Sequence, residues 1–381
     1  MYLESTEMFI RKHCIVQFDK IMKEIKKNLV ILAAGTGGHV YPGLCIAKNL
    51  ILKNVNIFWI GTKNGMEKDI IKGENISFHH IDFSGVRGKG LKVILKLPFK
   101  IAKASYQAFM ILKKISPNAI LSMGGYISFP CVIAGIFLNR PIIIHEQNIV
   151  FGLANNISRF FSKLIIVGFP MSIQNEKYKF LGNPSRYEGL PRKKVTHNKN
   201  VFNIAVIGGS LGAKVFNEII PKAVYEILRK TEYEINIIHQ TGKTHKSAEI
   251  QYNNFEVNID LREYIDDMSE VYEWCDLIIC RGGAITLTEI MNQGIPAIVI
   301  PYPYAVDNHQ LQNCSFLEKR DAIILIDQKN LTEKYLANII LKLINNVDLL
   351  NSLSENIYNL NNSNSTEEIC NEIENIMKIN K

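Results

Sequence analysis

A histidine follows a run of glycines near the amino end of the chain. The apolar, strand-like segment Leu29–Ala33 runs into Gly35, Gly37 and Gly38, and His39 comes directly after them. Glycines let the backbone turn sharply and let a ligand approach the peptide N–H groups. The turn itself needs no histidine, and an imidazole can exchange a proton near neutral pH. We interpret the segment as a polyphosphate or sugar cradle with a titratable group aimed into it; the alternatives are a dinucleotide-type loop and a structural histidine bonded to nearby backbone.

A second candidate site follows the apolar strand Leu277–Cys280. Arg281 ends this strand, Gly282 and Gly283 form a turn, and a helix is expected to begin at Ala284–Thr286. The N–H groups and the dipole at a helix start can hold a diphosphate. Glu289 lies about one turn into that helix, where its carboxylate could accept hydrogen bonds from a ribose diol. A capping carboxylate is the alternative for this residue, but the polar loop 307–310 that follows favours a nucleotide.

A third glycine-rich loop, Gly208–Gly212, links the strand-like segment Asn203–Ile207 to another helical pattern. Neither this loop nor the first one reads G-x-G-x-x-G, and neither carries the lysine of a P-loop. The sequence also has no D-x-D, so a metal-held diphosphate is not expected. Helix termini, together with Arg186 or Arg281, would then have to stabilise the charge of a departing diphosphate.

Strand-like and helix-like segments alternate along the whole chain. Short apolar strands separated by helices indicate parallel sheets covered on both faces. The expected strands are Leu29–Ala33, Asn56–Ile60, Ala119–Met123, Ile142–His145, Leu164–Val167, Asn203–Ile207, Glu234–His239, Leu277–Cys280 and Ala297–Ile300. The polar stretch around Pro191 divides them, so the predicted fold class is α/β with two doubly wound Rossmann-like domains facing a cleft.

The expected domain limits follow from this division. They are an N-terminal extension at 1–27, a first domain at 28–186, a linker at 187–200, a second domain at 201–350, and a C-terminal helix at 351–381 that packs back on the first domain. Composition agrees with globular domains, since 47% of the residues are hydrophobic and 21% are charged. The seven cysteines are scattered without a C-x-x-C pair, which predicts reduced thiols, no disulfide framework and no zinc site.

The net charge of +8 is concentrated in one segment. Residues 83–145 contain no Asp or Glu, and apolar side chains alternate with cations between Arg87 and Lys114. Helical spacing lets four of these cations share one face as a basic stripe, namely Lys92, Lys96, Lys100 and Lys103. A basic amphipathic segment suits an anionic membrane surface; the alternative is a solvated surface helix over a core. Nucleic acid is not an expected partner, because no recognition motif accompanies the charge. A membrane span between Lys114 and Arg140 is not expected either, because Gly124, Gly125 and Pro130 interrupt the uncharged run.

Taken together, these segments resemble the MurG family of UDP-N-acetylglucosamine (UDP-GlcNAc) transferases. The resemblance rests on ten short motifs that occur in one order between Leu29 and Cys314. They are GTGGHVYPG, SGVRGKG, MGGYIS, HEQN, GLAN, GNPSR, GGSLGA, YIDDM, RGGAITLTE and DNHQ. Three positions depart from the family pattern, namely Phe129, Leu211 and Tyr304, so the family's roles are not carried over to them.

The resemblance implies a GT-B glycosyltransferase fold, a lipid acceptor on the first domain and a UDP-sugar on the second. The implied reaction is inverting transfer of N-acetylglucosamine from UDP-GlcNAc to the 4-hydroxyl of undecaprenyl-pyrophosphate-linked N-acetylmuramoyl-pentapeptide, giving lipid II for peptidoglycan synthesis. No cofactor or metal is implied. The implied location is peripheral, at the cytoplasmic face of the cell membrane.

The resemblance also implies the residues of the site. His39 is the predicted base, with His145 and Glu146 in reserve. The predicted substrate-binding residues are Thr36, Gly37, Gly38, Asn148, Arg186, Ser210, Ile265, Ala284, Ile285, Thr286, Leu287, Thr288, Glu289 and Gln310. A UDP-GlcNAc 2-epimerase, a nicotinamide oxidoreductase and a non-catalytic nucleotide-sugar sensor remain alternatives at this stage.

Overall fold

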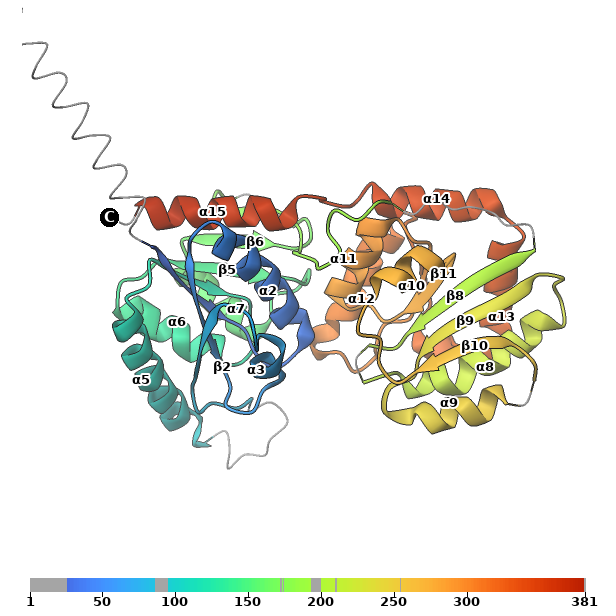
Figure 1. Cartoon of the computed structure of the whole chain (residues 1–381), viewed down its shortest axis with the longest axis horizontal. Helices are drawn as coiled ribbons and strands as arrows, with labels where there is room; N and C mark the ends of the chain where they lie inside the picture. Colours follow the sequence, from blue (N-terminus) through green and yellow to red (C-terminus); the bar gives the residue numbers. More distant parts are fainter. Residues whose placement is uncertain are drawn as a thin grey trace, which may run out of the picture. The chain divides into compact units, whose positions relative to one another are not determined.

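The computed structural model describes residues 26–85, 95–171, 173, 175–192, 200–209, 211–253 and 255–379 (Figure 1). The N-terminal extension up to residue 25, most of the SGVRGKG motif, linker residues 193–199 and Ser210 lie outside the described residues. The chain divides into two units. Unit 1 contains residues up to His145, Leu153–Ile165 and Ile369–Lys381, and unit 2 contains Glu146–Gly152 and Ile166–Glu368.

The first sheet has seven strands in the order β3-β2-β1-β4-β5-β6-β7, and the pairs from β3 through β5 are parallel. Its strands are β1 (Asn28–Leu32), β2 (Asn56–Gly61), β3 (Ile76–His80), β4 (Ala119–Ser122), β5 (Ile142–Glu146), β6 (Leu164–Val167) and β7 (Tyr178–Phe180). The intervening helices are α2 (Gly37–Leu52), α3 (Met66–Ile70), α5 (Leu97–Ile115), α6 (Ser128–Phe137), α7 (Leu153–Ser158) and the 3₁₀ turn η1 (Arg159–Phe161).

The second sheet has six parallel strands in the order β10-β9-β8-β11-β12-β13. Its strands are β8 (Val201–Ile207), β9 (Glu234–Gln240), β10 (Asn258–Arg262), β11 (Leu277–Cys280), β12 (Ala297–Val299) and β13 (Ile324–Leu325). Its helices are α8 (Lys214–Leu228), α9 (His245–Tyr252), α10 (Ser269–Trp274), α11 (Ala284–Gln293), α12 (His309–Glu318), α13 (Glu333–Ile344) and α14 (Val347–Tyr358), with 3₁₀ turns η2 (Gly242–Thr244), η3 (Val306–Asn308) and η4 (Gln328–Asn330).

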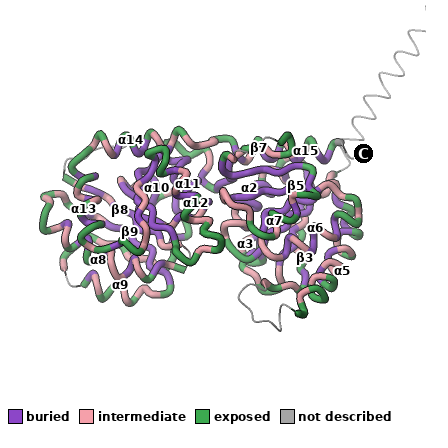
Figure 2. Tube along the Cα trace, turned by 180° about the vertical axis from the view of Figure 1, so that it is seen from behind, coloured by how far each residue is buried: buried purple, intermediate pink, exposed green. Residues whose placement is uncertain are grey.

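Both sheets are doubly wound, as the sequence predicts. Every strand predicted from the sequence is present, and the strands are largely buried (Figure 2). The prediction missed β3, β7, β10 and β13, which are the outer strands of the two sheets. Outer strands are covered on fewer sides and therefore need no continuous apolar run; β3, for example, carries His79 and His80.

The C-terminal segment differs from the single helix expected at 351–381. Helix α14 ends at Tyr358, and a separate helix α15 (Ser365–Ile379) follows. The intervening residues read NLNNSN, and Asn and Ser side chains favour turns because they bond to nearby backbone. Residues from Ile369 onward belong to unit 1, where the Cys370 thiol donates to the Ile46 carbonyl.

Candidate functional site

In each unit the glycine-rich loops lie where the strand order reverses. In the first sheet, β2 and β3 lie on one side of β1, and β4 to β7 lie on the other side. In the second sheet, β9 and β10 lie on one side of β8, and β11 to β13 lie on the other side. The reversal therefore lies between β1 and β4 in the first sheet and between β8 and β11 in the second. In doubly wound sheets a ligand binds beyond the carboxyl ends of the strands at this reversal. The loops after β1 and β4 in unit 1, and after β8 and β11 in unit 2, are therefore the candidate sites.

In unit 1 the first glycine loop leads into α2. Thr36 is the residue before the helix, and its carbonyl accepts hydrogen bonds from the N–H groups of His39 (3.1 Å) and Val40 (3.2 Å). Gly35 has a φ of +95°, a conformation that favours glycine. The loop therefore presents the start of α2, with Gly37, Gly38 and His39 partly exposed.

The MGGYIS segment closes against this helix start. Gly124 has a φ of +98°, and a Cβ placed there would lie 3.2 Å from Cε1 of His39. A Cβ on Gly125 would lie 2.8 Å from the Ala34 carbonyl oxygen. The two glycines are therefore needed for the loop after β4 to approach the His39 ring, so the fold brings these two motifs together.

The two reserve candidates for the base are engaged elsewhere. His145 is fully buried within β5. One carboxylate oxygen of Glu146 accepts hydrogen bonds from the backbone and side-chain N–H groups of Asn148 (3.2 and 3.3 Å), and the other accepts from the Gly152 N–H (3.0 Å). The Glu146 carboxylate therefore stabilises the loop that follows it. Of the three candidate bases, His39 is the most accessible to a ligand.

Asn148 lies in a network of amides within unit 2. Its Oδ1 accepts a hydrogen bond from Nδ2 of Asn313 (3.0 Å), which also donates to the Gly282 carbonyl (3.3 Å). The Asn313 Oδ1 accepts from the Ile149 N–H (3.0 Å). Asn313 is fully buried and thus fixes Asn148 beside the glycine turn after β11. The sequence did not point to Asn313.

Helix α11 begins at the glycine turn as predicted, with Gly283 as its N-cap residue. The Leu287 N–H is the first to bond within the helix, to the Gly283 carbonyl (3.0 Å). The N–H groups of Ala284, Ile285 and Thr286 precede it and have no intrahelical acceptor, because the first turn of a helix supplies none. These three N–H groups at the start of α11 are therefore the groups that an anion could bind.

The side chains of two predicted substrate-binding residues, Leu287 and Thr288, are engaged within unit 2. The Leu287 side chain is fully buried in the core of unit 2. The Thr288 hydroxyl donates to the Ala284 carbonyl (2.9 Å) and accepts from Nδ2 of Asn183 (3.0 Å). Both side chains point inward because the apolar face of α11 packs on the sheet, and their backbone N–H groups lie within the helix.

Glu289 is also buried, with 6% of its surface exposed. Its Oε2 accepts a hydrogen bond of 2.7 Å from the hydroxyl of Tyr272 in α10. Burial raises the pKa of the Glu289 carboxyl to about 7, against the opposing effects of the Tyr272 hydrogen bond and the Arg186 charge. Arg186 itself is exposed, so a cation lies near a carboxylate that could accept hydrogen bonds from a ligand.

Arg281 is not placed to stabilise a ligand's charge. Its guanidinium donates to the carbonyls of Ile300 (3.0 Å) and Pro301 (3.2 Å) and lies 4.5 Å from the Phe216 ring. Burial lowers the pKa of Arg281 to about 10. Of the two arginines considered from the sequence, Arg186 is therefore the better candidate.

Gln240, at the carboxyl end of β9, connects two loops of the candidate nucleotide site. Its Nε2 donates to the Gly209 carbonyl (2.8 Å), and its Oε1 accepts from the Ile265 N–H (3.0 Å). The Ile265 N–H is therefore used within unit 2. Gln310 also has an internal partner, since its Oε1 accepts from the Tyr302 N–H (2.9 Å). A polar residue at a strand's carboxyl end was the sequence signal that could have identified Gln240.

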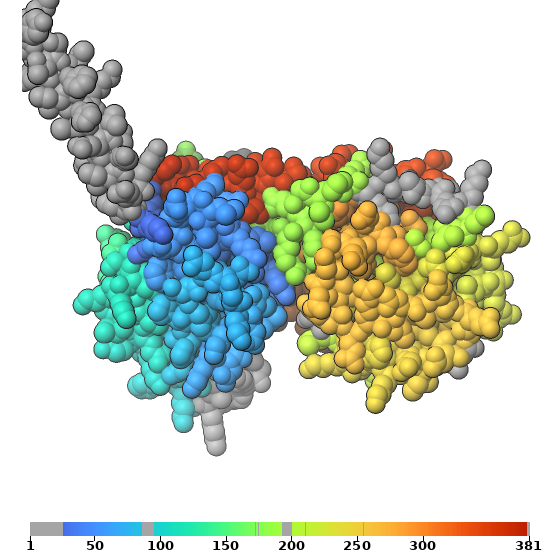
Figure 3. Space-filling view, viewed as in Figure 1, coloured from blue at the N-terminus to red at the C-terminus, as the bar shows by residue number. Residues whose placement is uncertain are grey.

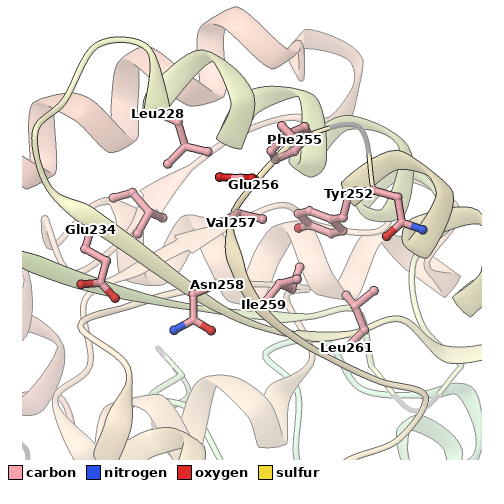
Figure 4. A pocket seen from close by; sticks show the side chains of 11 residues that line it. Leu228, Glu234, Tyr252, Phe255, Glu256, Val257, Asn258, Ile259 and Leu261 are labelled. Atoms are coloured by element: carbon pink, nitrogen blue, oxygen red, sulfur yellow. The ribbon is translucent and has the colours of Figure 1, made fainter.

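A pocket of about 580 Å³ opens elsewhere in unit 2, beside the outer strand β10 (Figure 4). Its lining includes Glu234 and Ile235, which begin β9, and Asn258, which begins β10. These residues lie at the amino ends of their strands, opposite the ends that carry the glycine loops. The pocket is therefore separate from the candidate nucleotide site.

Comparison with known proteins identifies the family. Residues 29–167 match the glycosyltransferase family 28 N-terminal domain, and residues 203–372 match the C-terminal domain of the same family. A UDP-N-acetylglucosamine–N-acetylmuramyl-(pentapeptide) pyrophosphoryl-undecaprenol N-acetylglucosamine transferase from Psychromonas ingrahamii is 39% identical over 354 residues, which cover 91% of this chain and 99% of that protein. The chain belongs to the MurG family of glycosyltransferases.

Solved structures agree with membership of the MurG family. The crystal structure of Acinetobacter baumannii MurG matches with a TM-score of 0.77 and 32% identity, covering 92% of this chain and 99% of that one. A protein described as a UDP-N-acetylglucosamine 2-epimerase from Listeria monocytogenes matches with a TM-score of 0.64 and 11% identity, covering 90% and 94%. The second likeness concerns the fold alone. The fold is thus GT-B, as the resemblance implied.

Proposed function

We propose that the protein transfers N-acetylglucosamine from UDP-GlcNAc to the 4-hydroxyl of N-acetylmuramoyl-pentapeptide carried on undecaprenyl pyrophosphate, with inversion at the anomeric carbon. The observation that carries this proposal is the 39% identity to the Psychromonas ingrahamii transferase over 99% of its length. The two candidate sites support it, because the reaction involves two diphosphates and each unit has a glycine-rich loop leading to a helix start.

The proposed donor site lies in unit 2. The N–H groups of Ala284, Ile285 and Thr286 bind the diphosphate of UDP, and Glu289 accepts hydrogen bonds from the ribose hydroxyls. Support comes from the position of this helix start at the reversal of the strand order. The exposed guanidinium of Arg186 stabilises the charge that develops on the departing UDP.

The other predicted donor contacts keep their places in this proposal with narrower roles. Ile265 remains a predicted contact of UDP, through a group other than its N–H, because that N–H is bonded to Gln240. Gln310 offers its Nε2, since its Oε1 is bonded to Tyr302. Asn148 contributes from its loop, and Ser210, which lies outside the described residues, remains a predicted contact.

The proposed acceptor site lies in unit 1, with His39 as the general base. His39 takes the proton of the acceptor hydroxyl as that oxygen forms a bond to the anomeric carbon, while the bond from this carbon to the UDP oxygen breaks. The loop residues Thr36, Gly37 and Gly38 surround the sugar and the diphosphate of the acceptor. Support comes from the partial exposure of His39 at a helix start and from the engagement of His145 and Glu146 elsewhere.

The proposed membrane contact is the α5–α6 face, defined here as Lys96, Phe99, Lys100 and Tyr106 at the start and along α5, together with Phe137 at the end of α6. Phe99 is 81% exposed and Phe137 is 79% exposed, and Tyr106 and Phe137 line an apolar groove of about 680 Å³ between α5 and α6. Helix α5 is at the molecular surface (Figure 3). None of the helices in the described part of the chain is long and apolar enough to cross a membrane. A peripheral location at the cytoplasmic face of the membrane is proposed with this contact.

One assay tests the reaction and its rivals. We expect purified protein to release UDP from UDP-GlcNAc when a short-chain lipid-linked acceptor is added, and to form a disaccharide with inverted anomeric configuration. With UDP-GlcNAc alone we expect neither N-acetylmannosamine nor hydride transfer from a nicotinamide. Formation of N-acetylmannosamine would identify an epimerase, and binding without turnover would identify a sensor.

A further inference from the structure

We infer that Tyr272 is a positioning residue for the donor: its hydroxyl orients the Glu289 carboxylate and holds it in the ionised form that accepts the ribose hydroxyls. The inference rests on the proposed function, which assigns the ribose to Glu289. Neither the glycine loops nor the motifs of the sequence point to Tyr272, because it lies on α10, seventeen residues before Glu289 in the chain.

The geometry of the pair supports this role. The Tyr272 hydroxyl donates to Oε2 of Glu289 at 2.7 Å, and both side chains are buried, with 1% and 6% exposure. A carboxylate has about four acceptor positions. Since Tyr272 occupies one of them, the remaining positions suffice for two ribose hydroxyls. The fixed phenol therefore selects one orientation of the carboxylate before any ligand arrives.

Tyr272 is itself held by its neighbours. The ring of Tyr187 lies edge-on to it, with the ring centroids 5.5 Å apart. The Tyr187 hydroxyl accepts a hydrogen bond from the Met268 N–H (2.9 Å), and the Tyr187 carbonyl accepts from Nε2 of Gln293 (3.2 Å). Because these contacts come from several elements of unit 2, the phenol has little freedom to turn away from Glu289.

Buried carboxyls tend to stay protonated, and a protonated Glu289 would lose part of its capacity to accept hydrogen bonds. Burial raises the pKa of Glu289 to about 7, and both the Tyr272 hydroxyl and the Arg186 charge oppose that rise. Around the pair, Tyr187 and Asp267 lie beside Arg186. Cys280 on β11 faces Tyr272, whose own pKa is raised mainly by burial, so the phenol remains a neutral donor.

The sign of the pH dependence follows from this arrangement. Glu289 is ionised above its pKa, so UDP-GlcNAc binding should strengthen as the pH rises through about 7 and level off above it. Without the Tyr272 hydroxyl the pKa of Glu289 rises further. The midpoint of the binding curve should therefore move to higher pH in Tyr272→Phe.

Calorimetric binding of UDP-GlcNAc, without acceptor, tests the inference between pH 5.5 and 9.5. UDP-GlcNAc is the ligand of choice because its diphosphate is a diester, whereas the terminal phosphate of UDP titrates near pH 6. We expect Tyr272→Phe to bind about tenfold more weakly at pH 7 and within about threefold of the parent at pH 9.5. An unchanged midpoint in Tyr272→Phe would overturn the inference.

Two further variants make the result specific. Tyr252→Phe is the matched control, because it removes another buried hydroxyl of unit 2, one that contacts Nδ1 of His239 at 3.2 Å. It should leave the midpoint in place. Fluorotyrosine at position 272 keeps the shape of the side chain and is a stronger donor, so it should move the midpoint to lower pH. This variant also decides the question if Tyr272→Phe fails to fold.

Glu289→Gln separates failure of this inference from failure of the proposed function. If Glu289→Gln binds UDP-GlcNAc as tightly as the parent at all pH values, Glu289 does not hold the ribose. That result would refute both the proposed ribose contact and the role of Tyr272. If Glu289→Gln binds weakly while Tyr272→Phe keeps the parent midpoint, only the role of Tyr272 falls. We expect Glu289→Gln to bind weakly and without the pH step.

Discussion

At the scale of single residues, His39 is the side chain on which the proposed chemistry depends. A Cβ on Gly124, whose φ is +98°, would lie 3.2 Å from its ring, so the loop after β4 packs tightly against it. We expect His39→Ala to lower kcat by about 10²–10⁴-fold, because a positioned general base contributes about that much. Steady-state kinetics with a short-chain acceptor measures this loss.

The same variant should bind UDP normally, since His39 belongs to unit 1 and the proposed UDP contacts belong to unit 2. Calorimetric titration with UDP provides this control. Turnover near that of the parent would make His39 a structural residue and would return His145 and Glu146 to consideration, despite the burial of both.

Glu289 gives the second prediction at this scale. Replacing Glu289 by Ala removes the proposed acceptor for the ribose hydroxyls and leaves the Tyr272 hydroxyl without its partner. Hydrogen bonds to charged groups contribute ~1.5–3 kcal/mol. We therefore expect the KM for UDP-GlcNAc to rise by at least about tenfold, with a smaller change in the KM for the acceptor. A donor KM within twofold of the parent would refute the ribose assignment.

At the scale of elements, α5 carries the proposed membrane contact. The sequence predicted one basic stripe through Lys92, Lys96, Lys100 and Lys103. Lys92 lies outside the described residues, Lys96 immediately precedes the helix, and Lys103 lies 3.9 Å from Asp82. The charge of Lys103 is thus partly neutralised by Asp82. Among the described residues, the basic stripe is therefore reduced to Lys96 and Lys100.

We expect Lys96→Gln combined with Lys100→Gln to weaken binding to anionic vesicles by at least about tenfold at low salt, because each cation near an anionic surface adds to the attraction and salt screens it. Sedimentation with vesicles of anionic or neutral lipid measures the effect. Lys222→Gln combined with Lys334→Gln, two exposed cations on α8 and α13 of unit 2, is the matched control.

Loss of binding in this control, or equal binding of the parent to neutral vesicles, would mean that α5 is an ordinary solvated helix. Phe99→Ser should also reduce vesicle binding, and it should do so at high salt, because its apolar contribution is not screened. Turnover of a short-chain acceptor should change little in all of these variants, since α5 carries none of the proposed catalytic or donor-binding residues.

At the scale of the whole molecule, the end of the chain helps to complete the core of unit 1. Residues from Ile369 belong to this unit, and Ile369, Cys370, Ile373 and Met377 are all buried. On the surface of the same helix, Lys53 pairs with Glu374 at 3.3 Å. From Ile369 onward the last helix is therefore a structural part of unit 1 and not an appendage.

We expect Ile373→Ala to lower the free energy of unfolding by ~2–5 kcal/mol, which is the usual cost of a large-to-small change in a core. Denaturant unfolding followed by circular dichroism measures this loss. Asn375→Ala, an exposed position on the same helix, is the control and should change the stability little. UDP binding at 25 °C should persist in Ile373→Ala if the damage stays within unit 1, and its loss would contradict that restriction.

The sequence by itself determined the central strands, the glycine loops and the helix start at Ala284. These features depend on local chemistry: continuous apolar runs form strands buried on both faces, and glycines mark turns that other residues cannot adopt. The order of the ten motifs was also sufficient to indicate the family, and the comparisons confirmed it.

Only the tertiary structure decided which side chains meet. The outer strands β3, β7, β10 and β13 depend on pairing with a neighbour more than on an apolar run of their own. The donation from Tyr272 to Glu289, the bridge of Gln240 between two loops and the inward turn of Thr288 all join residues from different elements. Such contacts are fixed by the packing of helices on the sheet, so residue type and spacing can mark a polar residue such as Gln240 but do not give its partners.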